Sequence, residues 1–77
     1  MPKMPRDISG EELIKKLEKA GYTTVRQTGS HVRLQKDSHQ ITIPKHQILK
    51  IGTLNAILMD IASNMHKTKF EIINLIF

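Results

Sequence analysis

His31 follows a glycine–serine pair and stands among side chains that suit acid–base chemistry on a phosphate ester. Imidazole titrates near neutral pH and is the side chain best suited to proton transfer. Hydroxyl and cationic groups surround it in the sequence: Thr28, Ser30, Arg33, Lys45 and His46. Cleavage of RNA needs a base that activates the ribose 2′-hydroxyl and cations that stabilise the charged phosphorane. These residue types permit that chemistry, although a histidine beside a turn is more often an ordinary solvated side chain.

A predicted β-hairpin positions His31. Residues 22–28 are rich in Thr and Val, and residues 31–36 alternate polar and apolar side chains, so both segments are expected to be strands. Gly29-Ser30 between them suits a two-residue type II′ turn. The resulting register pairs Thr28 with His31, Arg26 with Arg33 and Thr24 with Gln35 on the exposed face, and Val25 with Leu34 on the core face.

Two arginines directly opposite each other repel, and such pairs normally cost stability. A phosphate bound between or beside Arg26 and Arg33 would remove that cost. The alternative is that the two long side chains splay into water.

A third strand is expected at residues 39–43, after a turn at residues 36–38. Its register pairs Leu34 with Ile41 and Val32 with Ile43, again toward the core. The strand ends at Pro44, which has no N–H for a ladder. The three strands form an antiparallel meander, and His31 lies between Thr28 and the corner at residues 44–46.

Helical patterns flank the meander. Ser9 and Glu12 form a capping box, apolar residues recur at helical spacing behind it, and Gly21 ends that helix. After a connector at residues 45–52, Thr53 is expected to cap a second helix that ends at Asn64. Its apolar stripe is Leu54, Ile57, Leu58 and Ile61.

A last capping box, residues 68–71, predicts a short C-terminal helix, with a β-strand as the alternative because Ile is abundant there. The expected fold class is therefore α+β, in the order α-β-β-β-α with that extra helix. Helices cover one face of the three-stranded antiparallel sheet and leave the other face free.

Length and composition limit the function classes. The 77 residues provide for one domain, at residues 9–77, behind a flexible leader at residues 1–8. The chain has no Cys, no run of about 20 apolar residues and no signal peptide at its start, so a cytoplasmic protein that does not enter the membrane is expected. Residues 15–50 contain eight Lys or Arg but only two acidic residues, and the net charge of the chain is +5. This excess favours a polyanionic partner, or serves solubility alone.

One ordered set of motifs resembles a known family. Ala20-Gly21-Tyr22 is followed by Gly29-Ser30-His31, then by Ile43-Pro44-Lys45-His46, and then by Gly52-Thr53-Leu54 before Ile57-Leu58. Between Ser9 and the C-terminus the chain is similar to the HicA (YcfA-like) toxins of toxin–antitoxin systems. A Gly-Ser-His triplet alone would carry no weight, whereas its placement among the other motifs is specific.

The resemblance implies a double-stranded-RNA-binding-domain-like fold and an mRNA-cleaving endoribonuclease activity that is independent of the ribosome. It implies that His31, in the Gly-Ser-His motif, is the catalytic residue, and that a HicB-type antitoxin blocks the site. His46 occupies a family motif and is carried over as a substrate contact. We expect metal-independent transfer to the 2′-oxygen, with no cofactor. The RNA-binding residues expected are Ser30, Arg33, Arg26, Lys45, His46, Thr28 and Lys36.

Three alternatives remain open. The first is an RNA-binding module of the same fold without chemistry, although its scarce aromatic residues provide no stacking platform for bases. The second is a metal site built from the four histidines, whose spacings fit no known ligand pair. The third is a protein-interaction domain that docks through Met59, Met65 and residues 72–77, which would also allow a homodimer.

Overall fold

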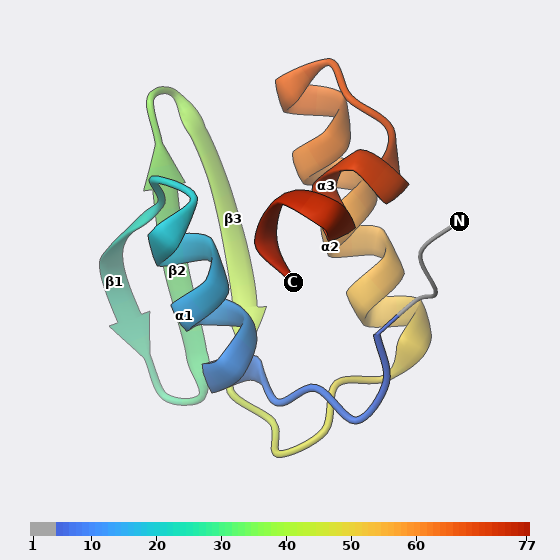
Figure 1. The fold of residues 1–77 in the computed structure, drawn as a ribbon. Helices are drawn as coiled ribbons and strands as arrows, with labels where there is room; N and C mark the ends of the chain where they lie inside the picture. The colour runs from blue at the N-terminus through green and yellow to red at the C-terminus, as the bar shows by residue number, and fades with distance from the viewer. Residues whose placement is uncertain (1–4) are drawn as a thin grey trace.

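The computed structural model describes residues 5–77, and its element order is one helix, three strands and two helices (Figure 1). The elements are α1 (Gly10–Lys19), β1 (Thr23–Thr28), β2 (His31–Lys36), β3 (His39–Pro44), α2 (Ile51–Met65) and α3 (Lys69–Ile76). The strands form one antiparallel sheet in the order β1-β2-β3. The predicted α+β class and meander are confirmed, as is a helix at the C-terminus.

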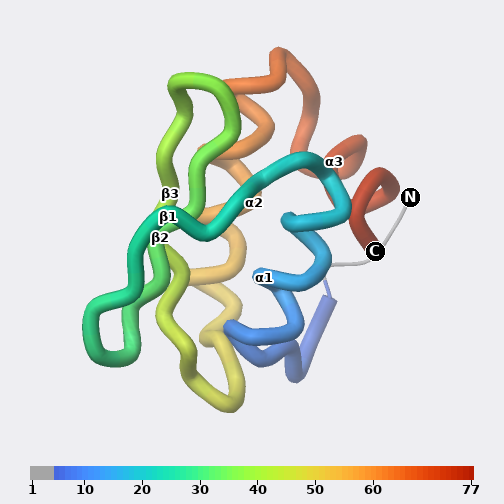
Figure 2. Tube along the Cα trace, turned by 90° about the vertical axis from the view of Figure 1, so that its left-hand side faces the viewer, coloured from blue at the N-terminus to red at the C-terminus, as the bar shows by residue number. Residues whose placement is uncertain are grey.

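The two faces of the sheet have different partners. All three helices lie on one side of it, and the other side faces solvent (Figure 2). Side chains alternate along β2 and β3, so Val32, Leu34, Ile41 and Ile43 are buried against the helices. Their register is as predicted, with Leu34 opposite Ile41 and Val32 opposite Ile43. The intervening polar side chains therefore all lie on the free face.

Local signals in the sequence set both ends of α1. The Ser9 hydroxyl accepts a hydrogen bond from the Glu12 N–H at 2.9 Å. At the other end the N–H of Tyr22 donates to the Leu17 carbonyl, and the N–H of Gly21 donates to Glu18. This is a Schellman ending, and Gly21 supplies its left-handed residue with φ +104°.

The expected register of β1 is wrong beyond Arg26. A β-bulge at Val25 shifts the pairing, so Thr24 rather than Val25 lies opposite Leu34, and Thr23 lies opposite Gln35. Val25 is half exposed instead of buried. The strand starts at Thr23, one residue later than expected, and all six of its residues are exposed.

The second helix also differs in its bounds. It begins at Ile51 behind Lys50, which makes no side-chain cap, so the expected cap Thr53 lies inside the helix. Leu49 explains this early start because it is buried and its N–H donates to the Ile8 carbonyl at 2.7 Å. The helix ends at Met65 rather than Asn64.

The predicted capping box of α3 is confirmed in both directions. The Thr68 hydroxyl accepts from the Glu71 N–H, and the Glu71 carboxylate accepts from the Thr68 N–H. These bonds to Thr68 lower the pKa of Glu71. Ile72, Ile73 and Ile76 pack into the core, whereas Leu75 and Phe77 stay partly exposed.

Part of the expected leader packs against the domain. Residues 1–4 lie outside the described residues. Ile8, by contrast, is buried, and Gly10 donates its N–H to the His46 carbonyl at 2.9 Å. Residues 8–10 thereby hold the loop that follows β3. Among residues 5–77, no helix has the length and apolar character that crossing a membrane requires.

A chain of hydrogen-bonded side chains, which runs from buried Tyr22 to exposed Asp60, joins the sheet to α2. The hydroxyl of Tyr22, a side chain 1% exposed, lies 2.8 Å from Nδ1 of His39. Nε2 of His39 lies 3.3 Å from a carboxylate oxygen of Asp60. Because the carboxylate only accepts, the neutral ring carries its proton on Nε2 and accepts from the tyrosine through Nδ1. His39 therefore serves packing and points away from the free face.

Replacing Gly10 with Ala should destabilise the fold by about 1–3 kcal/mol, because the new Cβ would overlap the Pro44 carbonyl oxygen. Gly52→Ala is the matched control, since a Cβ there meets nothing within 4 Å in a helix. That variant should be more stable by roughly 0.5–1 kcal/mol. Urea unfolding measures both changes, and equal stability of the two variants would contradict the tight contact.

Replacing Tyr22 with Phe should reduce the loss of stability in alkali. Burial, and secondly the Asp60 carboxylate, raise the pKa of the Tyr22 hydroxyl above 10.0. The Tyr22 hydroxyl contributes to the free energy of unfolding fully below pH 10, and this contribution is lost as the pH rises through the pKa that Tyr22 has in the folded protein. The reason is that the hydroxyl loses its proton at a lower pH in the unfolded chain than in the folded protein. Urea unfolding between about pH 9 and 11 should show a steeper decline for the parent than for Tyr22→Phe. Identical slopes would contradict the shift.

Candidate functional site

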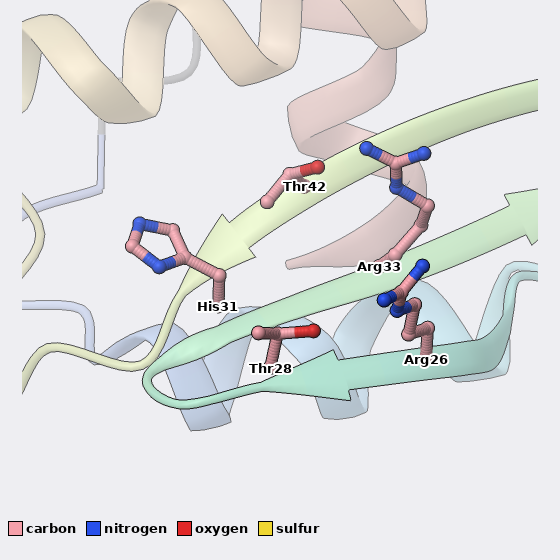
Figure 3. Close-up of a pocket in the computed structure, with 5 residues that line it drawn as sticks. All are labelled: Arg26, Thr28, His31, Arg33 and Thr42. Atoms are coloured by element: carbon pink, nitrogen blue, oxygen red, sulfur yellow. The ribbon is translucent and has the colours of Figure 1, made fainter.

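A shallow hollow on the free face of the sheet gathers five side chains from all three strands (Figure 3). Its lining is Arg26, Thr28, His31, Arg33 and Thr42. Four of these were predicted from the sequence to belong to one site. The lining contains two guanidinium groups, two hydroxyls and one imidazole, and no carboxylate.

The hairpin register places these residues side by side. Thr28 lies directly opposite His31, and Arg26 lies directly opposite Arg33, as expected. Gly29, the first loop residue, has φ +57°, which a type II′ turn requires at this position. Because the loop has only two residues, the pairs nearest to it follow directly from the turn.

His31 begins β2 and is exposed, so water and a substrate can reach its ring. Across the sheet it is paired with Pro44 of β3 as well as with Thr28. The adjacent N–H of Lys45 donates to the Ser30 carbonyl at 2.6 Å, which ties the turn to the loop after β3. Backbone pairing on both sides therefore fixes the main chain at His31, from which the imidazole extends (Figure 3).

The two arginines bring like charges together with no acidic partner. Within residues 5–77, the ion pair that the structure contains joins His39 to Asp60, so neither guanidinium is paired with a carboxylate. The Arg33 side chain extends from β2 toward β3, near Thr42, and the Arg26 side chain extends from β1 toward β2 (Figure 3). Two adjacent guanidinium groups can bind one anion, such as a phosphate, that accepts hydrogen bonds from both.

Some predicted RNA-binding residues lie outside the hollow. Lys36 donates from Nζ to the Ala20 carbonyl at 2.9 Å and lies 6.0 Å from the centre of the Tyr22 ring, at the C-terminal end of α1. Lys45 lines a second hollow, between α1 and β1, together with Glu11 and Ile14.

His46 and Ser30 also lie outside the lining of the hollow. The His46 side chain is exposed, and its carbonyl accepts from Gly10. Ser30 occupies the turn next to His31 and is exposed.

Sequence reasoning missed Thr42, which lies directly opposite Arg33. The signal was present, because a strand that turns Ile41 and Ile43 inward must turn Thr42 outward. The same parity places Gln40 on the free face, where its Oε1 accepts from Nη1 of Arg33 at 3.3 Å.

A metal centre finds no support in the described part of the chain. Residues 5–77 contain no group of three or more His, Cys, Asp or Glu side chains arranged to hold an ion. His39 is engaged with Tyr22 and Asp60 on the opposite side of the sheet from His31. The hollow itself brings together an imidazole, two guanidinium groups and two hydroxyls.

Comparison with known proteins gives one match. The family model described as the HicA toxin of bacterial toxin–antitoxin systems matches residues 10–62. Neither the curated proteins nor the solved structures yield a match. The matched region runs from the start of α1 into the last turns of α2 and includes every residue of the hollow. Because it covers more than half of the chain, the protein belongs to the HicA toxin family of bacterial toxin–antitoxin systems.

Proposed function

We propose that this toxin is an endoribonuclease that cleaves mRNA without a metal ion, with His31 as its catalytic residue. The observation that carries the proposal is the hollow itself, in which one exposed imidazole shares the free face with two arginines that have no acidic partner. Membership of the family makes the chain the toxin of a toxin–antitoxin pair. Chemistry on RNA is the activity that best fits this combination of groups.

In the proposed reaction His31 accepts the proton of a ribose 2′-hydroxyl. The 2′-oxygen attacks the adjacent phosphorus, the bond from phosphorus to the 5′-oxygen breaks, and a 2′,3′-cyclic phosphate forms. The leaving 5′-oxygen takes a proton from water and ends as a hydroxyl, because the lining of the hollow besides His31 contains only arginines and threonines. The hydroxide left from that water takes the proton from His31, which restores the base. General base catalysis of this kind contributes roughly 10²–10⁴-fold in rate.

The arginines would act on the phosphate. Negative charge increases on the non-bridging oxygens as the phosphorane forms, and fixed cations stabilise it most when they need no rearrangement. Arg26 and Arg33 are opposite each other in the sheet, so a phosphate can receive hydrogen bonds from both. Thr28 and Thr42 offer hydroxyls at the edges of the same hollow.

Further RNA contacts would lie around the hollow. Ser30 precedes His31 in the turn, and Lys45 and His46 follow Pro44, the strand end that pairs with His31. Lys36 lies at the other end of β2 with its amine held by the Ala20 carbonyl on the helix side of the sheet, so RNA would meet it beyond the edge of the free face. These residues would extend the positive charge beyond one phosphate.

A toxin–antitoxin pair includes an antitoxin, and we propose that it is a HicB-type protein that covers the free face of the toxin's sheet. The toxin would act in the cytoplasm, where mRNA is found. We take residues 9–77 as its single domain, since α1, the sheet and the last two helices share one core.

Replacing His31 with Ala should lower RNA cleavage by about 100-fold or more, because the general base is removed. A long unstructured RNA in excess EDTA is the substrate, and circular dichroism checks the fold. The control is His66→Asn, which removes a histidine at the end of α2 where the left-handed backbone tolerates Asn. Equal cleavage by His31→Ala and the parent would reject His31 as catalyst. RNA binding by both without any cleavage would favour the non-catalytic RNA-binding module.

Replacing Arg33 with Ala should weaken RNA binding about tenfold while leaving the protein folded, because one charged contact to phosphate is lost. The slope of log affinity against log salt should become shallower by about 0.7 for a single strand. Fluorescence anisotropy over a salt series measures both quantities. Lys19→Ala removes the same charge from α1, on the covered side of the sheet, and should change them less. Matching losses in the two variants would show that only net charge matters.

A further inference from the structure

A row of hydrogen-bonded side chains crosses the free face beside the hollow. Gln35 donates from Nε2 to the Asp37 carbonyl at 2.7 Å, and Gln40 donates from Nε2 to Oε1 of Gln35 at 3.1 Å. Arg33 then donates from Nη1 to Oε1 of Gln40 at 3.3 Å. We call Gln35 and Gln40, with the Asp37 carbonyl, the glutamine relay.

The relay follows from the register of β2 and β3. Gln35 and Gln40 are direct cross-strand partners, and Arg33 precedes Gln35 by two residues, so all three share one face. Long side chains reach diagonal neighbours on the same face, which allows Arg33 to meet Gln40. The relay therefore begins at the turn between β2 and β3 and ends at the hollow.

The relay has a direction. A backbone carbonyl only accepts, so Gln35 must turn its NH₂ group toward Asp37 and its oxygen toward Gln40. Gln40 must then donate to that oxygen, which leaves its own oxygen for Arg33. The Asp37 carbonyl in the turn thereby sets the orientation of both side-chain amides, that of Gln35 and that of Gln40. Arg33 meets an oxygen, which attracts its charge, rather than an NH₂ group, which would repel it.

We propose that Gln40 is a positioning residue that holds the Arg33 guanidinium for RNA phosphate, with Gln35 orienting Gln40. This inference rests on the proposed function. Arg33 lies directly opposite Arg26, so the two like charges repel each other in the free protein. The Gln40 oxygen holds Arg33 on the β3 side of the hollow.

The tether does not consume the binding capacity of Arg33. A guanidinium has five N–H donors, and Gln40 takes one of them. The others remain for a phosphate shared with Arg26. A side chain already ordered loses less conformational entropy when the ligand arrives, which strengthens binding.

A double-mutant cycle tests this coupling. Every protein in the cycle carries His31→Ala, so that under the proposed function RNA is bound but not cut. Affinity is measured for this background alone and for the background with Gln40→Leu, with Arg33→Ala and with both. Gln40→Leu should weaken binding about threefold when Arg33 is present, as expected for an exposed charged hydrogen bond. It should have no effect when Arg33 is already Ala. Gln35→Leu should show a smaller loss with the same dependence on Arg33.

Gln27→Leu is the matched control. It makes the same chemical change on β1, but Gln27 is paired with Val32, lines the hollow on the helix side of the sheet, and donates at 3.4 Å to the Gly29 carbonyl rather than accepting from an arginine. It should leave the affinity unchanged. A loss as large as that of Gln40→Leu would mean that the glutamine effect is general, and the proposal would fail.

Nuclear magnetic resonance provides a readout that needs no RNA. Rotation about the Cζ–Nε bond of Arg33 should be slower in the parent than in Gln40→Leu, because the Nη1 hydrogen bond to Gln40 restrains the guanidinium. Equal rotation rates overturn the tether.

The outcomes separate the two proposals. A parent that fails to bind or cut RNA counts against the proposed function. RNA binding by the parent with no loss in Gln40→Leu overturns the relay alone. Equal losses with and without Arg33 would mean that Gln40 contacts RNA itself, which also overturns the relay.

Discussion

The two-residue turn at Gly29-Ser30 is the constraint on which the structure depends. It fixes Thr28 opposite His31 and Arg26 opposite Arg33, and it fixes which side chains of β2 face the helices. A slip of one residue would move Val32 and Leu34 into water and His31 and Arg33 into the core. Core packing and the chemistry of the free face are therefore two consequences of one register. Burial of the apolar face holds the corner that carries His31 in place.

The free face keeps an electrostatic conflict that the rest of the fold tolerates. Arg26 and Arg33 oppose each other without a carboxylate, and both are exposed, so water screens most of the repulsion. The stability lost in this way is small compared with that supplied by the buried residues of β2, β3 and the helices. An anion in the hollow would relieve the repulsion on binding. The charges of the hollow are thus better balanced with an anion bound than in the free protein.

Sequence reasoning predicted the parts of the site that short-range rules determine. The turn defined the pairs next to it, and side-chain alternation separated the two faces of β2 and β3. It failed beyond Arg26 because nothing about Val25 distinguishes a bulged residue from a buried one, and an apolar side chain in an alternating strand is expected to face inward. It also failed at Thr53, where the anchoring of Leu49 by Ile8 outweighed a favourable capping residue. Lysine directions could not be predicted, because Lys36 turns toward a helix-end carbonyl that only the tertiary fold brings near.

The exposure of β1 has a consequence for how such a toxin can diversify. All six residues of this strand are exposed, and its bulge leaves Thr24 and Gln27 rather than apolar side chains facing α1. Substitutions in it create no cavity in the core, so most of them fall within the small range of ordinary surface changes. Yet the strand borders hollows on both faces of the sheet. Substitutions in β1 can therefore change the lining of both hollows while the scaffold stays folded.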